Sequence, residues 1–224
     1  MDVAVGGKEH PSCVLVSQIN TVVVNPYWSL PTSIAATELW PELKKDKNYL
    51  NKKHIQVLQK DSNGNYVEIK ANKINWTQLT EKEFNSFRYR QDPGIDNSLG
   101  KVKFMFANPC QIYLHDTNES EVFDIYRRDF SHGCIRVSQP RTLADYILTE
   151  ESNWDLDKVA ATFKQEQSKS INLTKPLNIY IVYFTSWVSN DDWVQFRYDI
   201  YNYDKESKYP VYLPKRKTIE TEDD

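Results

Sequence analysis

The sequence predicts an α+β fold in which a predominantly β core carries flanking helices and an inserted region. Short apolar segments such as "DVAV", "CVLV" and "INTVVV" are rich in valine, have the length of strands and are separated by turn-forming residues. Longer segments with helical spacing of apolar residues follow them. We therefore expect a sheet as the core, with helices packed against it.

Composition limits the kind of protein. A chain of 224 residues suits one large domain and is long enough to bury a hydrophobic core. Its 28 basic and 31 acidic residues give a net charge of −3, which does not favour a general nucleic-acid binder. No apolar run approaches the roughly 20 residues of a membrane span, and no secretory signal follows Met1. We expect a folded domain without a nucleic-acid partner or a transmembrane segment.

The inserted region covers about residues 26–98 and is polar. Its first part, "LPTSIAATELWPELKKDKNYL", has helical spacing, and Pro41 is expected to kink or split that helix. The segments "HIQVLQ" and "YVEI" follow, and the Asn63-Gly64 pair between them predicts a β-hairpin.

The second half of the chain returns to strands. "KVKFMFANP" and "QIYLHD" have strand patterns, "PRTLADYIL" and "DLDKVAATFKQEQ" are predicted helices, and "LNIYIVYFTSWV" and "WVQFRYDIYNYD" are aromatic strands. We expect a single domain over residues 1–214, followed by a charged, disordered tail at 215–224.

Two short segments contain the residues most suited to chemistry, "CQIYLHD" and "SHGCIRV". Alternate residues of a strand share a face, so Tyr113 and His115 lie on one face, and the same rule pairs Cys134 with Arg136. The apolar residues between them are expected in the core. Two polar faces could therefore meet in one site.

Cys134 is a candidate nucleophile. A thiol with a reference pKa of about 8.5 needs a neighbouring imidazole or positive field to form a thiolate at neutral pH. We favour His115 over His132 as the base, because a separate strand can aim its ring at the sulfur. Gly133 allows close backbone approach, so the amides of Gly133 and Cys134 could stabilise an oxyanion, and Arg136 could bind a carboxylate.

Other interpretations remain open for these residues. A free cysteine is often a buried hydrophobic residue, and Cys13 with Cys110 is a possible disulfide pair. A zinc site lacks the short spacings that make such predictions strong. Its ligands would be His115, Asp116, His132 and Cys134.

The combination of "YLHDT" with "HGCIR", with the two histidines 17 positions apart (132 − 115 = 17), resembles the signature of the YkuD-type L,D-transpeptidases of bacterial cell-wall synthesis. The segments "NPYWSLPTSIA", "RYRQDPGIDNSLGKVKFMF", "FSHGCIRV" and "FRYDIYNYD" resemble successive blocks of the YcbB-like branch of that family. The resemblance thus extends over nearly the whole chain.

The resemblance implies roles for individual residues. Cys134 matches the acylated nucleophile, His115 matches its base, and the backbone carbonyl of Asp116 orients the imidazole. The amides of Gly133 and Cys134 match the oxyanion hole. The substrate pocket would include Tyr113, His132, Arg136 and, from a capping region over the cleft, Trp28.

The resemblance also implies an activity. Cys134 would attack the third-residue carbonyl of a peptidoglycan tetrapeptide stem, release D-alanine, and pass the acyl group to a diaminopimelate amine of another stem or to water. The expected partners are donor and acceptor stem peptides, with no metal or organic cofactor. Carbapenem sensitivity, a role in cell shape and location in the periplasm or cell envelope follow from the same resemblance.

The branch usually carries further sheet residues, a glycan-binding module and an export signal upstream. We therefore expect a fragment of a longer protein or the product of a truncated gene. Two alternatives from other classes stay open: a zinc-dependent peptidoglycan amidase, and a catalytically silent wall-binding domain.

Overall fold

The computed structural model describes residues 1–206, which fall into two compact units. The first unit is Met1–Val182 and contains the main sheet and the inserted region, and the second begins at Tyr183. Both the expected domain end at residue 214 and the predicted tail at 215–224 lie outside the described residues. Within residues 1–206, no helix combines the length and apolar character needed to cross a bilayer.

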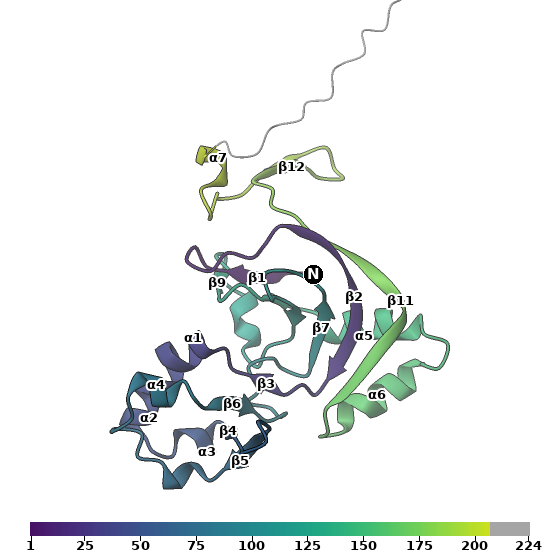
Figure 1. Ribbon diagram of the computed structural model, residues 1–224. Helices are drawn as coiled ribbons and strands as arrows, with labels where there is room; N and C mark the ends of the chain where they lie inside the picture. Colours follow the sequence, from purple (N-terminus) through teal and green to yellow (C-terminus); the bar gives the residue numbers. More distant parts are fainter. Residues whose placement is uncertain (207–224) are drawn as a thin grey trace, which may run out of the picture. The chain divides into compact units, whose positions relative to one another are not determined.

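The first unit is built on a seven-stranded sheet with the strand order β11-β2-β7-β8-β10-β1-β9 (Figure 1). β2 pairs antiparallel with both β7 and β11, whereas β8 and β10 run parallel. The valine-rich segments predicted as strands are confirmed here, whereas only the first part of the aromatic segment "LNIYIVYFTSWV", up to Ile181, lies in a strand of this sheet. The strands are β1 (Val3–Gly6), β2 (Leu15–Val24), β7 (Val102–Phe106), β8 (Leu114–His115), β9 (Asp129–Ser131), β10 (Ile135–Val137) and β11 (Lys169–Ile181).

Two helices cover one face of this sheet, and both were predicted. α5 (Pro140–Thr149) begins with a proline, which needs no hydrogen-bond acceptor in the first turn. α6 (Leu156–Lys164) follows Asp155, whose side chain accepts a hydrogen bond from the Lys158 amide. The apolar faces of both helices join the core of the sheet beside β2, β7 and β11 (Figure 1). The catalytic candidates must therefore occupy the opposite face.

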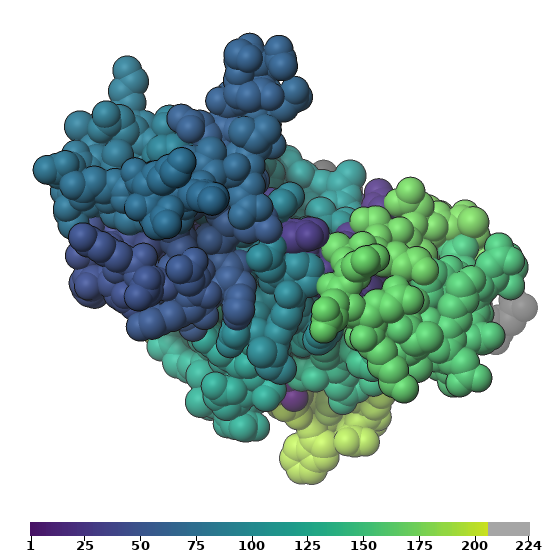
Figure 2. Space-filling view, turned by 90° about the horizontal axis from the view of Figure 1, so that it is seen from below, coloured from purple at the N-terminus to yellow at the C-terminus, as the bar shows by residue number. Residues whose placement is uncertain are grey.

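The inserted region has a sheet and a hydrophobic core of its own. Its four strands are ordered β3-β6-β4-β5, and β4 and β5 form the predicted hairpin around Gly64. In the space-filling view this region, coloured blue, is a distinct lobe (Figure 2). Its elements are β3 (Trp28–Ser29), α1 (Thr32–Ile34), a π-helical turn η1 (Ala35–Leu39), α2 (Trp40–Lys45), α3 (Tyr49–Lys52), β4 (Ile55–Lys60), β5 (Tyr66–Ile69), η2 (Ala71–Lys73), α4 (Glu81–Phe84) and β6 (Arg88–Gln91).

The effect expected of Pro41 takes the form of a π-helical turn. α1, η1 and α2 follow one another without interruption, and Pro41 lies in the first turn of α2. Proline cannot donate a backbone hydrogen bond, and its ring would clash with the carbonyl four residues earlier in a regular helix. The wider π turn directly before Pro41 relieves that clash, so the helical segment is split rather than broken.

The second unit contains the strands β12 (Ser186–Val188) and β13 (Val194–Phe196) and the helix α7 (Tyr203–Glu206). β12 and β13 pair as an antiparallel hairpin and are shorter than the aromatic segments that predicted them. The prediction of a strand through "WVQFRYDIYNYD" was wrong for its second part, which leaves the strand after Phe196 and becomes helical at Tyr203. The Tyr183 hydroxyl donates a hydrogen bond to Asp199, which links the start of this unit to the segment after β13.

Candidate active site

Strand register gathers the predicted residues on one face of the main sheet. Lys103 of β7 lies opposite His115 of β8, and His115 lies opposite Arg136 of β10. Directly opposed residues on neighbouring strands share a face, so these side chains form one row. Tyr113 and Cys134 each lie two positions earlier in the chain, which places them on the same face. The residues between them, including Ile135, are buried in the core, as predicted.

Cys134 is a free, partly buried thiol. Burial raises its pKa, while hydrogen bonds from the backbone amide and side chain of Tyr113 and the positive charges of Lys103 and Arg136 lower it. Burial prevails, so the sulfur is protonated at neutral pH. A nucleophilic role for this thiol would therefore require a base to remove its proton.

His115 has the properties of that base. Its imidazole is only 5% exposed, and Nδ1 lies 2.5 Å from the carbonyl oxygen of Asp116. Because a carbonyl can only accept, Nδ1 carries the proton and Nε2 keeps its lone pair. Burial lowers the pKa of His115 to about 4, and the charges of Arg136 and Lys103 act in the same direction. The ring is therefore neutral at pH 7 and able to accept a proton.

The Asp116 carboxylate is occupied by the backbone around it. It accepts hydrogen bonds of 2.7 Å from the amides of Lys101 and Thr117. Burial raises the pKa of Asp116, and these two hydrogen bonds oppose that effect. Its carbonyl, rather than its carboxylate, faces His115.

The turn that carries Cys134 is fixed by a serine. Gly133 has φ +106°, a left-handed conformation that favours glycine. Its amide donates to Ser131 Oγ over 3.2 Å, and the same hydroxyl donates to the carbonyl of Cys134 over 2.6 Å. Within residues 1–206, the Cys134 amide has no hydrogen-bond acceptor. Of the two amides expected to stabilise an oxyanion, that of Cys134 is available and that of Gly133 is engaged.

Two cations flank the thiol and the imidazole. Arg136 stacks its guanidinium over the Phe130 ring at 5.4 Å, and its buried Nε has no hydrogen-bond partner within the described residues. The Lys103 ammonium lies 5.4 Å from the centre of the Tyr113 ring, and burial lowers its pKa. A guanidinium beside a second cation suits a ligand carboxylate.

His132 and Trp28 belong to the border between the main sheet and the inserted region. His132 Nε2 lies 3.1 Å from a carboxylate oxygen of Glu38 in η1, and its ring stacks on His10 at 5.1 Å. Trp28 lines a cavity of about 230 Å³ that Glu38 also lines. Glu38 thus contacts His132 and lines the same cavity as Trp28, which connects the turn that carries Cys134 with the inserted region.

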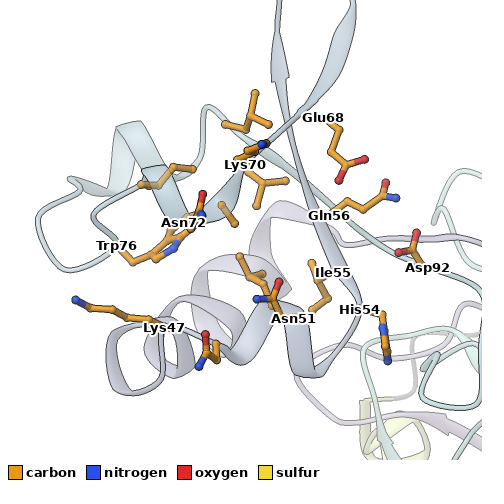
Figure 3. A pocket seen from close by; sticks show the side chains of 16 residues that line it. Lys47, Asn51, His54, Ile55, Gln56, Glu68, Lys70, Asn72, Trp76 and Asp92 are labelled. Carbon is orange, nitrogen blue, oxygen red and sulfur yellow. The ribbon is translucent and has the colours of Figure 1, made fainter.

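A hollow of about 680 Å³ lies within the inserted region and not at Cys134. Figure 3 shows Trp76, Asn72 and Asn51 around one part of it, and His54 with Asp92 around another. None of the residues on the catalytic face lines it. The buried residues at the bottom of this hollow belong to the hydrophobic core of the inserted region.

The side chains considered for zinc do not converge. In the described part of the chain, no group of three or more histidine, cysteine, aspartate or glutamate side chains is arranged to hold a metal ion. The rings are directed elsewhere, His132 towards Glu38 and His115 towards a carbonyl. The ligand set proposed from sequence is therefore not assembled. Its members were His115, Asp116, His132 and Cys134.

The possible pair Cys13 and Cys110 is confirmed as a disulfide, with a Cα–Cα distance of 6.5 Å. The bond connects the segment before β2 with the segment before β8. Cys134 is the remaining thiol of the three cysteines.

Sequence reasoning missed Lys103, Ser131, Glu38 and Ser12. Alternation in "KVKFMF" does separate Lys103 from its buried neighbours, but only the register against β8 shows that it lies beside His115. The serines are common residue types with no spacing signal of their own, and their partners are backbone atoms.

Two comparisons agree with this geometry. The model of the YkuD L,D-transpeptidase catalytic domain matches residues 1–162. A protein of Haemophilus influenzae named "Putative L,D-transpeptidase" is 32% identical over 204 residues, which are 91% of this chain and 40% of that relative. The chain thus spans less than half the length of this relative. The chain therefore belongs to the YkuD family of L,D-transpeptidase catalytic domains.

Proposed function

We propose that the protein is a peptidoglycan L,D-transpeptidase in which Cys134 is the acylated nucleophile. The observation that carries this proposal is the contact of His115 Nδ1 with the Asp116 carbonyl. The Asp116 carbonyl holds the Nδ1 proton, so the basic Nε2 is left for the thiol on the same face of the sheet. Family membership makes the cell wall the natural source of substrate.

In the first half-reaction, Cys134 Sγ bonds to the third-residue carbonyl of a tetrapeptide stem while its proton moves to His115 Nε2. The tetrahedral intermediate then collapses, and the bond to the terminal D-alanine breaks. The departing amine takes the proton back from His115, which leaves a thioester on Cys134 and a neutral imidazole. No cofactor takes part in this acyl transfer.

In the second half-reaction, the side-chain amine of a diaminopimelate on another stem attacks the thioester. His115 takes a proton from that amine and returns it to the departing sulfur. The product is a crosslink between two third-position residues, and replacement of the amine by water gives L,D-carboxypeptidase activity.

The charges of the site favour the transition states of both steps. The resting thiol and imidazole are neutral, and negative charge appears on sulfur and then on the carbonyl oxygen. Lys103 and Arg136 already act to lower the pKa of Cys134, so they stabilise the developing charge. The Cys134 amide, which has no acceptor within residues 1–206, is the oxyanion donor in this scheme.

The same cations suit the substrate. Stem peptides are rich in carboxylates, and the guanidinium of Arg136, a partly exposed residue, can bind one of them. Tyr113, His132 and Trp28 complete the proposed pocket. We place the protein in the periplasm or cell envelope, as a target of carbapenems with a part in wall organisation and cell shape.

D-Alanine release tests the proposal against a silent wall-binding domain. The wild-type protein is expected to release D-alanine from a tetrapeptide stem. The Cys134→Ala variant is expected to bind the stem but to release no D-alanine. Release that persists in Cys134→Ala would contradict the assignment, and binding by wild type without any release would favour the silent domain. Chelators serve as a control, because a cysteine enzyme should retain its activity in their presence.

A further inference from the structure

We propose that Ser12 is a positioning residue of the oxyanion hole, and this rests on the proposed acyl transfer at Cys134. Its hydroxyl holds the carbonyl of Gly133 and thereby aims the amide of Cys134 at the place where the oxyanion forms. Ser12 lies 121 positions before Gly133 in the chain and is outside the "SHGCIRV" segment.

The hydrogen bonds of Ser12 fix the direction of its proton. The side chain is buried, with 6% exposure, and Oγ lies 2.7 Å from the Gly133 carbonyl oxygen. The same Oγ accepts the amide proton of Gly6 over 2.9 Å. A carbonyl oxygen can only accept, so in this contact the hydroxyl is the donor to Gly133, and it accepts the Gly6 amide through a lone pair.

The geometry of the peptide bond transmits this contact to the nucleophile. The carbonyl of Gly133 and the amide N–H of Cys134 belong to one planar trans unit and point in opposite directions. A donor that holds the carbonyl from one side therefore directs the N–H to the other side. Glycine permits many backbone conformations, and Gly133 at φ +106° would otherwise allow this peptide plane to rotate.

Ser12 is itself held on a rigid support. A side chain on Gly6 would place its Cβ 2.8 Å from the Ser12 nitrogen and 2.9 Å from the Gly133 Cα, so β1 passes very close to both. The next residue, Cys13, is bonded to Cys110. A packed strand and a disulfide thus keep the hydroxyl at a fixed distance from the catalytic turn.

Ser12 and Ser131 have different tasks in this arrangement. Ser131 binds the amide of Gly133 and the carbonyl of Cys134, which closes the turn around the nucleophile. Ser12 holds the peptide plane between these groups, the plane that carries the oxyanion donor. Loss of Ser12 should therefore affect the stability of the oxyanion more than the binding of substrate.

The test compares Ser12→Ala with Ser12→Thr, which keeps a hydroxyl, and with Thr162→Ala. Thr162 is 2% exposed and donates to the Lys158 carbonyl over 2.8 Å in α6, so its loss removes a buried hydroxyl contact away from the site. We expect Ser12→Ala to lower the acylation rate constant by up to about a hundredfold, because a Cys134 amide that turns away no longer donates to the oxyanion, and loss of one oxyanion donor has effects of this order. Ser12→Thr should recover most of the rate, and Thr162→Ala should leave it unchanged.

Two further measurements separate positioning from general damage. Affinity for a tetrapeptide stem, measured in the Cys134→Ala background, should be the same with and without Ser12→Ala. The infrared carbonyl band of the acylated enzyme should move to higher wavenumber in Ser12→Ala, because the carbonyl loses its hydrogen bond. If Ser12→Ala does not fold, Ser12→Cys provides a nearly isosteric side chain with a weaker donor and should show a smaller change in the same direction.

Folded Ser12→Ala that acylates at the wild-type rate with an unmoved carbonyl band would overturn this inference. An equal loss of rate in Thr162→Ala would also overturn it. Failure of the proposed function looks different, since the wild-type protein would then form no acyl-enzyme at all.

Discussion

Protonation of His115 should destabilise the folded protein, and the effect can be worked from its pKa. Burial lowers the pKa from an ordinary value of 6.5 to about 4. The unfolded chain therefore binds a proton more readily between these two values, and stability decreases as pH falls from about 6.5 to about 4. A difference of about 2.5 between the two pKa values corresponds to about 3 kcal/mol. Above pH 6.5 this group has no effect on stability.

The matched variant is His115→Asn, whose side-chain amide can still donate to the Asp116 carbonyl but does not titrate. Urea unfolding between pH 4 and 7 measures the free energy of unfolding for both proteins. Carboxylates titrate in both, so the difference between the two pH profiles isolates His115. The wild-type protein should lose about 3 kcal/mol more than His115→Asn across this range.

Acylation should follow the same titration. As pH is lowered, the acylation rate should fall near pH 4 and not near pH 6.5. The reason is that the imidazole of His115 in the folded protein stays neutral down to about pH 4. Parallel stability profiles for wild type and His115→Asn, or an acid limb of acylation near 6.5, would refute the buried neutral imidazole.

Three further predictions concern neighbouring groups. His115→Ala should slow acylation by a factor on the order of 10² to 10⁴, and Asp116→Asn by far less, since the Asp116 carbonyl remains in place; equal losses in acylation kinetics would count against the carbonyl role. Arg136→Ala should raise KM for tetrapeptide stems about tenfold, as expected for a lost charge-assisted contact to a carboxylate; steady-state kinetics that show an unchanged KM would remove Arg136 from the pocket. Replacing Cys13 and Cys110 together by serine opens a loop with a sequence separation of 97 and should lower the free energy of unfolding by about 4 to 5 kcal/mol in urea titrations; equal stability would show that the bond constrains little.

Local patterns in the sequence were enough to place most of the strands and to divide their residues between two faces. Alternation put Cys134 and Arg136 opposite Ile135, and the structure has this division. The rule depends only on the period of a strand, so it holds without knowledge of the fold. The hairpin at Gly64 was equally local, because its turn requires a positive φ.

The remaining parts of the site depend on contacts between distant segments. Lys103 reaches His115 through strand register, and register is decided by the packing of the whole sheet. Ser12 meets Gly133 only because β1 passes beside the catalytic turn. The form of the helix around Pro41 also depends on its surroundings. Either a kink or a π turn accommodates a proline, and the packing around the helix decides between them.

Intact mass of the protein after incubation with a carbapenem tests the central claim most directly. Wild type and Cys134→Ala are compared with the disulfide left intact, and the modified peptide is located by proteolysis. We predict one adduct per wild-type chain, on the peptide that contains Cys134, and none on Cys134→Ala. A folded wild-type protein without an adduct, or an adduct that persists in Cys134→Ala, would contradict Cys134 as the nucleophile.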